Sequence, residues 1–510
     1  MATTSSRVMP DSLLNKAKSE ETFDCPERSL STARPIPENS EHFNVALGSR
    51  SYINQYAGIY FMRLAELKPS VVKSVSRSWN QAVIDGQSVI YVDKVLDIRE
   101  NTICWVAGTI YKELKYKPSM LEEVTRSHWG APPPVPEKYI DPGTDEISLE
   151  DESGRVKLVG EKIKSVLLTT GCTIAVMGIE TPGGDFDVID IRLPEFAIQK
   201  PFPLRTENKD GRISNKKASP RYLALVSGLE FTADMPHALS VDLLAEFLRG
   251  ELGGSNTSNL SSDITRLIVA GNSIASPSAE AFEEEGSVVD DLRKSAKLNS
   301  RYGHNAVTFD PKPLEHLDDF LANICFSIPV DIMPGEKDPG TISLPQQPMH
   351  PIMFPKARKY GTKRGEEPIL YETFSSVTNP NWWDIDGVRI LGTSGQTIDD
   401  IFKYVEGDDR LAMIESTLRW RHLAPTAPDT LNCYPFVEYD PFVINETPHV
   451  YFVGNQPRFE TRLVEGYDCI DERPVKVRII SVPKFCETGE IVLVNLDNLE
   501  TESVKFSIDL

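Results

Sequence analysis

The sequence predicts a chain of mixed α/β and β structure with two folded parts: an OB-type small barrel, then a larger β-sandwich flanked by helices. Short runs that alternate apolar and polar side chains occur within residues 87–193, as strands with one buried face do. Continuous apolar runs broken by glycine recur between 221 and 456, which is typical of strands covered on both faces. Between these later runs, the stretches 240–249 and 314–324 show helical spacing, which places helices beside the sheet.

Shifts in composition along the chain predict its domain boundaries. The first 40 residues are rich in Ser, Thr, Pro and charged side chains, a composition that cannot bury enough apolar surface to fold. Apolar residues at helical spacing then follow from 52 to 75, with Pro69 as an expected interruption. The predicted parts are a disordered tail (1–40), a helix plus the OB-type domain (41–205), a linker (206–219), and the larger domain (220–510) with a flexible acidic insertion near 274–299.

The OB-type barrel is predicted from the number of its short strands. Roughly five strand-like runs in about 110 residues fit a barrel of this kind. OB folds often bind single-stranded nucleic acid through aromatic side chains in a basic groove. Tyr91, Trp105 and Tyr111 are available here, but the charge around them is mixed, so core packing or a protein interface is favoured. The strand-like runs are 88–98, 102–114, 155–158, 173–179 and 186–193.

The larger domain is organised around five apolar runs that end at glycine and small polar residues. Glycine at a strand end lets the chain turn sharply and leaves backbone groups free at the edge of the sheet. We therefore expect the residues after these strands to gather at one edge. The runs are RYLALVSGLEF (221–231), RLIVAGN (266–272), IPVDIMPGEK (328–337), VRILGTSGQ (388–396) and HVYFVGNQ (449–456).

This layout resembles the calcineurin-like metallophosphoesterases, whose strand ends carry Asp, His and Asn ligands for two metal ions. Such chemistry needs carboxylates, imidazoles and an amide that hold the metals and polarise a bridging water. Here Leu229 and Pro457 offer no donor atom, and Lys337 would place a cation in the metal site. The resemblance therefore implies an inactive phosphoesterase-like domain with no catalytic residue, metal or cofactor. The former metal-site positions are Ser227, Leu229, Asn272, Glu336, Lys337, Asn455 and Pro457.

A second set of motifs makes the resemblance more specific. It comprises WRHLAPTAPDTLNCYPF (420–436), LPQQPMHPIMFP (344–355) and TNPNWWDIDGVRILGTSGQTIDD (378–400). With the altered strand ends, these motifs resemble the B-subunits of eukaryotic family-B DNA polymerases, over most of the chain from about 52 to 494. Members of that family carry an OB domain before the phosphoesterase-like one. Overall length and a short N-terminal tail favour the polymerase delta branch.

The resemblance implies a non-catalytic accessory and scaffold subunit that serves DNA replication and repair synthesis in the nucleus. Its expected partners are the C-terminal cysteine-rich, metal-binding domain of the catalytic subunit and a third subunit. Two alternatives stay open: the B-subunit of polymerase alpha or epsilon, and an active metallophosphoesterase with altered ligands. His422 and Asp429 could also form a catalytic pair, although a structural hydrogen bond that holds the Pro-rich loop is favoured.

Charge and cysteine content restrict the classes of ligand. The chain has 54 Lys and Arg against 75 Asp and Glu, a formal net charge of −21. Tight binding to duplex DNA draws on clustered Lys and Arg, so we expect DNA contacts mainly through the holoenzyme. The seven cysteines include no C-x-x-C pair, which argues against a zinc or iron–sulfur site in this chain. No apolar run approaches 18 residues, so no membrane segment is predicted.

The best candidate for a partner contact is the Pro-rich stretch 344–354. It is too rich in proline for the interior of a helix or strand, and a loop across the surface is expected. Met353 and Phe354 are its candidate contact residues, since interface centres are apolar and poor in charge. The alternative is that the loop folds back onto the core of its own domain.

Overall fold

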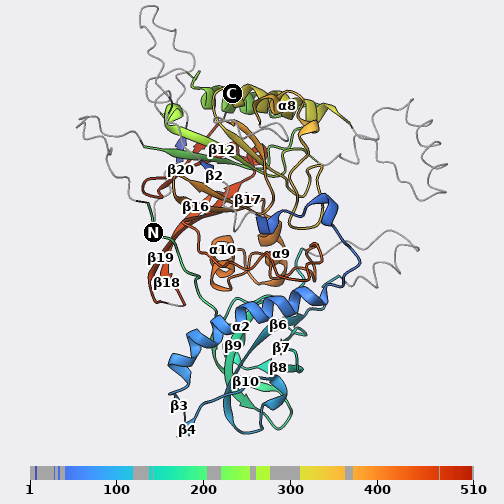
Figure 1. Ribbon diagram of the computed structural model, residues 1–510, viewed down its shortest axis with the longest axis vertical. Coiled ribbons are helices and arrows are strands. Elements are labelled where there is room, and N and C mark those ends of the chain that lie inside the picture. Colours follow the sequence, from blue (N-terminus) through green and yellow to red (C-terminus); the bar gives the residue numbers. More distant parts are fainter. Residues whose placement is uncertain are drawn as a thin grey trace, which may run out of the picture.

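The computed structural model describes residues 6–8, 28, 33–34, 41–84, 86–118, 137–141, 143–203, 220–252, 260–275, 310–361, 372–469 and 471–507. It has mixed α/β architecture with a barrel at one end and two facing sheets at the other (Figure 1). None of the described helices combines the length and hydrophobicity that crossing a bilayer requires.

The barrel is a six-stranded sheet closed on itself by pairing between β6 and β9. Alternate residues of β6 face opposite sides: Cys104 and Val106 point into the barrel core, whereas Trp105 and Ala107 lie under the helix α2. Because both sides are covered, the strand is buried along most of its length. The barrel elements are α2 (Ala57–Trp79), β5 (Ile90–Tyr91), β6 (Ile103–Glu113), β7 (Glu146–Glu150), β8 (Arg155–Val159), α4 (Glu161–Lys164), β9 (Thr173–Glu180) and β10 (Phe186–Arg192), with a small hairpin of β3 (Val83–Ile84) and β4 (Gln87–Ser88).

Three details of the barrel differ from expectation. The helix α2 continues through Pro69, which lies on its exposed side; the packing of Val71 and Val75 on the barrel outweighs one lost hydrogen bond. The run 88–98 is only partly a strand, because the Asp151 carboxylate accepts a hydrogen bond from the Val95 amide (2.8 Å) at the start of the short helix η4 (Val95–Asp97). The strand β7 was not predicted.

The sandwich consists of a seven-stranded and a six-stranded sheet that enclose a shared apolar core. Leu225 and Ile268 of the first sheet lie in this core with Ile390 and Phe452 of the second. The first sheet, in spatial order, is β1 (Ser6–Val8), β21 (Thr501–Lys505), β20 (Glu490–Asn495), β11 (Tyr222–Val226), β12 (Ile264–Ala270), β13 (Val330–Met333) and β14 (Phe374–Ser376). The second is β18 (Glu460–Tyr467), β19 (Pro474–Pro483), β17 (Val450–Gln456), β16 (Val388–Thr393), β15 (Asn381–Ile385) and β2 (Ala33–Arg34).

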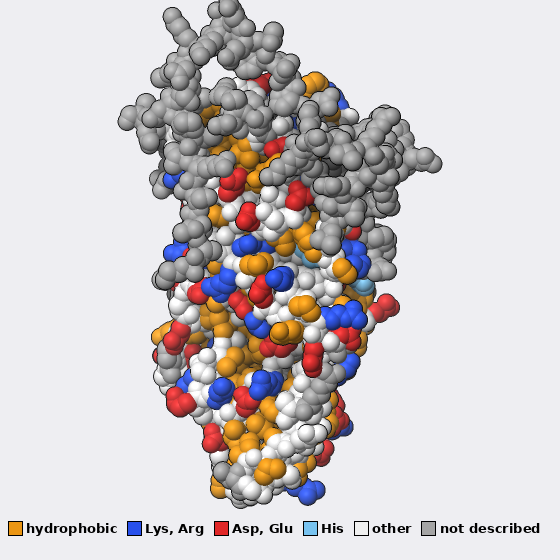
Figure 2. All heavy atoms as spheres, turned by 90° about the vertical axis from the view of Figure 1, so that its left-hand side faces the viewer, with side chains coloured by type: hydrophobic (Ala, Val, Ile, Leu, Met, Phe, Trp, Pro, Cys, Tyr) orange, Lys and Arg blue, Asp and Glu red, His pale blue; other side chains and the backbone are white. Residues whose placement is uncertain are grey.

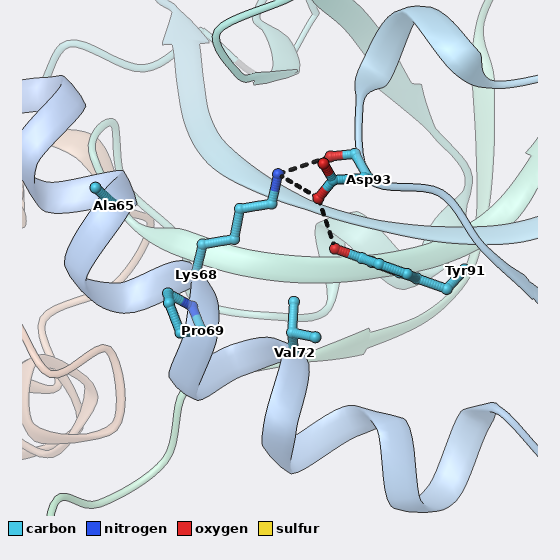
Figure 3. A pocket seen from close by; sticks show the side chains of 6 residues that line it. All are labelled: Ala65, Lys68, Pro69, Val72, Tyr91 and Asp93. Carbon is cyan, nitrogen blue, oxygen red and sulfur yellow. Dashed lines mark hydrogen bonds and ion pairs between the residues drawn. The ribbon is translucent and has the colours of Figure 1, made fainter.

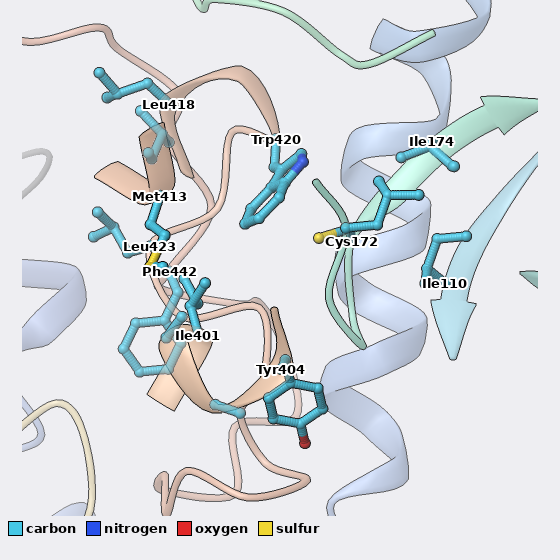
Figure 4. Packing of buried hydrophobic residues seen from close by; sticks show 14 of the residues in the cluster. Ile110, Cys172, Ile174, Ile401, Tyr404, Met413, Leu418, Trp420, Leu423 and Phe442 are labelled. Carbon is cyan, nitrogen blue, oxygen red and sulfur yellow. The ribbon is translucent and has the colours of Figure 1, made fainter. Parts of the chain in front are cut away.

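Helices cover the outer faces of both sheets. On the first sheet lie α5 and α8, and on the second lie α9 and α10, which face the barrel (Figure 1). Side chains of α9 and α10 share one apolar cluster with barrel residues, so that Trp420 points toward Cys172 (Figure 4). The helices are α5 (Ala238–Arg249), α8 (Lys312–Cys325), α9 (Gln396–Tyr404), α10 (Arg410–Arg419) and α11 (Phe485–Thr488), with short helices η2 (Glu41–Phe43), η3 (Leu47–Ser49), η6 (Pro351–Met353) and η7 (Ala357–Tyr360).

Parts of the range 1–40 belong to the fold, although a disordered tail was expected there. The strand β1 pairs with β21, and β2 pairs with β15. Arg28 donates hydrogen bonds to three backbone carbonyls, including Leu248 O at 2.7 Å. The edge of a sheet presents unpaired backbone groups to any neighbouring segment, which is a physical reason for both pairings. The rest of that range, the predicted linker at 206–219 and residues 276–299 of the insertion lie outside the described residues.

A candidate functional site at the strand ends

The carboxyl ends of β11, β12, β13, β16 and β17 meet at one end of the sandwich, as the glycine pattern predicted. The Gly228 amide donates to Gly271 O at 3.0 Å. A Cβ at Gly271 would lie 2.8 Å from the Gly335 Cα and 2.5 Å from the Ser394 Cβ. Because such a contact leaves no room for a side chain, only glycine allows the turns to approach this closely.

Three of the predicted site residues come together here, and they bind protein atoms rather than enclose an open site. The buried Ser227 hydroxyl accepts a hydrogen bond from the Asn455 amide (2.8 Å) and donates to Pro483 O (3.0 Å). The Asn455 side chain donates to Ser394 O (2.6 Å). The Asn272 side chain accepts from the Lys337 amide at 3.1 Å. These groups join the two sheets at the position where the resemblance places metal ligands.

Both asparagines have left-handed backbone conformations, with φ of 51° at Asn272 and 57° at Asn455. Asparagine is among the few residues other than glycine that adopt this region readily. The motifs GN at 271–272 and GN at 454–455 are therefore explained by backbone geometry as well as by hydrogen bonding.

Of the other four predicted positions, Lys337 reaches this cluster only through its backbone amide, and the remaining three do not join it. Leu229 is buried in the apolar core beneath α5. The Lys337 ammonium pairs with the Glu230 carboxylate, while Glu336 and Pro457 are exposed. Among the described residues, no group of three or more His, Cys, Asp or Glu side chains is arranged to hold a metal ion.

Sequence reasoning missed a network of neutral side chains that fills the space beside these strand ends. The side-chain amide of Asn379 donates to Gln346 Oε1 (2.8 Å) and Ser394 Oγ (2.6 Å). Gln346 in turn donates to Gly335 O (3.0 Å) and accepts from the Gln396 side chain (2.9 Å). Amides that satisfy one another carry no net charge to attract a dication. The signal for this network lay in the motifs LPQQP, TNP and GTSGQT, whose pairing in space the sequence does not show.

Comparison with known proteins assigns the family. The model for the B-subunit of DNA polymerases alpha and epsilon matches residues 223–461, and the model for the DNA polymerase delta subunit OB-fold domain matches residues 55–191. The DNA polymerase delta small subunit of Oryza sativa subsp. japonica is 38% identical over 90% of this chain and 95% of its own. The small subunit of Saccharomyces cerevisiae is 39% identical over 92% and 93%. The chain belongs to the DNA polymerase delta small-subunit family.

This membership confirms the resemblance to polymerase B-subunits and the choice of the delta branch, and it supports an accessory subunit of polymerase delta. It also agrees with the OB-type domain, since the matched OB-fold model covers α2 and the barrel. Among solved structures, a purple acid phosphatase from yellow lupin seeds matches at 10% identity with a TM-score of 0.22, covering 65% of this chain and 59% of that chain. A likeness this low carries no argument about fold or activity.

In this member of the delta small-subunit family, a buried polar cluster joins the barrel to the sandwich. The Arg63 guanidinium of α2 donates to Asp440 Oδ2, Pro425 O and Ala427 O, each at 2.8 Å. His422 Nε2 lies 2.8 Å from the same carboxylate oxygen. Burial alone would raise the pKa of Asp440, but His422 and Arg63 together hold it well below its usual range. The motif HLAPTAPDTL therefore forms a binding loop for Arg63.

The same cluster corrects the alternative pairing of His422 with Asp429. His422 is paired with Asp440, and its Nδ1 accepts a hydrogen bond from the Ala424 amide (3.2 Å). Asp429 instead accepts from the Tyr404 hydroxyl (3.0 Å) and pairs with Lys117. The favoured interpretation, a structural hydrogen bond that holds the Pro-rich loop, agrees with this geometry.

Stability should depend on pH through His422. Burial and then the Arg63 charge lower the pKa of His422 from 6.5 to about 4. Between these values the unfolded chain binds a proton that the folded chain does not, so this stabilisation is present above about pH 6.5 and is lost as the pH falls toward 4. From pH 7 to pH 5 the loss should be about 2 kcal/mol.

Urea unfolding at the two pH values measures this contribution. The variant His422→Gln should lose that part of the pH dependence, whereas His316→Gln, at an exposed position of α8, should behave as the wild type does. An unchanged pH dependence in the His422 variant would show that the histidine already carries its proton in the folded chain.

The structure also corrects the candidate partner contact in the loop 344–354. The Phe354 side chain is 0% exposed and packs edge-on against Phe374, with ring centroids 5.5 Å apart. Met353 is half-buried and packs on the same core. A side chain that is buried this fully cannot contact another chain, so Phe354 is a core residue. At Phe354 the loop therefore folds back onto its own domain, whereas a partner contact at the half-buried Met353 stays a prediction.

Proposed function

We propose that this chain is a non-catalytic scaffold subunit of DNA polymerase delta that serves DNA replication and repair synthesis in the nucleus. In this proposal it binds the C-terminal cysteine-rich, metal-binding domain of the catalytic subunit and links a third subunit to it. The observation that carries the proposal is the strand-end cluster, read together with family membership. There the Asn455 backbone amide donates to the Ser227 hydroxyl, and the Asn379 side chain donates to Gln346, so the site supports assembly rather than hydrolysis.

In this proposal the strand ends are a degenerate phosphoesterase site. A metal-dependent hydrolase needs an open metal position and a water beside it. Here the Ser227 hydroxyl and the side chains of Asn272 and Asn455 form hydrogen bonds with backbone atoms of the protein. Lys337 lies beside them.

Contacts with DNA are proposed to run mainly through the holoenzyme. Two of the three candidate aromatic side chains of the barrel are covered by their neighbours: Trp105 is buried against Tyr91, and Arg155 lies over the Tyr111 ring at 4.3 Å. Tyr91 is 36% exposed, but its hydroxyl donates to the Asp93 carboxylate. On the face shown in Figure 2, Lys and Arg side chains of the described residues are interspersed with Asp and Glu. A surface of mixed sign offers little of the counterion release that drives binding to nucleic acid.

Co-expression with the catalytic and third subunits tests this proposal. We expect the full-length chain to co-purify with both, and to depend on the cysteine-rich C-terminal domain of the catalytic subunit for that assembly. The isolated chain should hydrolyse no generic phosphodiester, such as bis-p-nitrophenyl phosphate, in the presence of manganese. Metal-dependent turnover, or normal assembly with a catalytic subunit that lacks that domain, would refute the corresponding part.

A further inference from the structure

An apolar surface begins just before α2 and contains few charges. Ile53 is 91% exposed, Tyr52 is 64% exposed, and Phe61 on α2 is 54% exposed. Between residues 44 and 62 the sequence contains one charged residue, Arg50. Exposed aromatic side chains in a stretch depleted of charge are characteristic of the centre of a protein interface.

This segment is fixed in place by the sandwich domain. The Ser51 amide donates to the Tyr434 hydroxyl at 2.8 Å, and the Tyr52 ring lies edge-on to the Tyr434 ring at 5.4 Å. The exposed Val437 is adjacent to α2, since its Cα lies 4.0 Å from the Cβ position of Gly58. Residues of both domains therefore form one preorganised surface, which lowers the ordering cost of binding.

The surface continues along the outer face of α2. Phe61, Ala65 and Pro69 follow one another at four-residue spacing and are exposed, so they lie on one side of the helix. Beyond them is an open pocket between α2 and β5, lined by Ala65, Lys68, Pro69, Val72, Tyr91 and Asp93 (Figure 3). At its edge Asp93 accepts from the Tyr91 hydroxyl at 2.8 Å and pairs with Lys68.

We infer that this α2 surface, formed by Tyr52, Ile53, Tyr56, Phe61, Ala65, Pro69 and Val437, binds a helical segment of the polymerase delta catalytic subunit. The segment presents aliphatic or aromatic side chains to Phe61 and the pocket, and it carries Lys or Arg along its edges. The small residues on either side of Phe61 allow another helix to approach closely. This inference rests on the proposed function.

Charge at the border of the surface supports a basic partner. Glu66 and Glu438 are exposed beside the apolar residues, and the chain as a whole carries a net charge of −21. Complementary charge at the rim steers association and excludes partners of the same sign. Lys68 is neutralised by its pairing with Asp93, so the exposed carboxylates of Glu66 and Glu438 favour a segment with apolar side chains between basic ones.

The test is co-expression of the full-length chain with the catalytic and third subunits, followed by quantification of each subunit in the complex. Ile53→Glu and Phe61→Glu should each reduce recovery of the catalytic subunit roughly tenfold, as the loss of an interface anchor does. The matched control is Phe326→Glu, at an 80% exposed phenylalanine that directly follows α8, the helix at the opposite end of the molecule (Figure 1). It should assemble as the wild type does. Glu438→Lys should weaken assembly and reduce its sensitivity to salt.

The outcomes separate this inference from the proposed function. If the wild type fails to bind the catalytic subunit, the proposed function is refuted. If the wild type and both surface variants assemble equally, the function holds and the α2 surface is the wrong interface. If the variants lose only the third subunit, the occupant is wrong. Thermal unfolding of each isolated variant checks its fold. If Phe61→Glu melts early, the milder Phe61→Ser replaces it.

Discussion

Replacing Arg63 with methionine should lower the free energy of unfolding by about 3–5 kcal/mol. The Arg63 side chain is fully buried, and it donates to the Asp440 carboxylate, which is also fully buried. Its removal leaves that carboxylate paired only with His422 and strips donors from Pro425 O and Ala427 O. The cost comes from the charge and carbonyls left behind rather than from the pair itself, whose formation already required desolvation of both ions.

Urea unfolding of the two proteins measures this difference at pH 7. The matched control is Arg458→Met, which removes an exposed arginine paired with Glu460; a surface pair of this kind should change stability by about 0.5 kcal/mol or less. A loss below about 1 kcal/mol for Arg63→Met would mean that water or a rearranged loop replaces the guanidinium.

Truncating Phe354 to alanine should also cost about 3–5 kcal/mol. The ring is enclosed between α8, the η7 segment and Phe374 in the core of the first sheet, so the deletion creates a cavity that the surrounding elements cannot fill completely. Ile352, two residues earlier in the same loop, is 68% exposed. Ile352→Ala should therefore change stability by about 0.5 kcal/mol or less.

Thermal or denaturant unfolding of the two variants gives the comparison directly. Equal, small losses would indicate that the loop leaves the core in solution and that Phe354 is free to contact a partner after all. A large loss for Phe354→Ala with an unchanged Ile352→Ala would place the loop in the core of its own domain, as the structure has it.

Local patterns in the sequence were enough to predict most strands and the turns at their ends. The apolar run at 222–226 coincides with β11, and Gly228 and Gly271 make the expected close turns. These features depend on residues that are neighbours in the chain, where period and backbone preference act directly. The helix α2 is longer than predicted, since it continues past Pro69. Tertiary packing decides whether an exposed proline ends a helix.

The candidate site was less predictable, because its contacts join distant parts of the chain. Gln346 and Asn379 are 33 residues apart, and neither residue taken alone indicates that the two side chains form a hydrogen bond. His422 pairs with Asp440 rather than with Asp429, which is nearer to it in the sequence. Which of several carboxylates a buried imidazole meets depends on how the loop folds in space, and no spacing rule encodes that choice.

The link between Arg63 and Asp440 also affects how the chain can fold while it is being made. The two residues are separated by 377 positions, so the carboxylate is synthesised long after the helix that carries the guanidinium. At a rate of about 5–20 residues per second, that interval is roughly 20–75 s. Throughout it, the side of α2 that will face the sandwich stays uncovered on the nascent chain. Barrel and sandwich can lock together only when nearly the whole protein has emerged from the ribosome, which makes this helix a natural client for a chaperone.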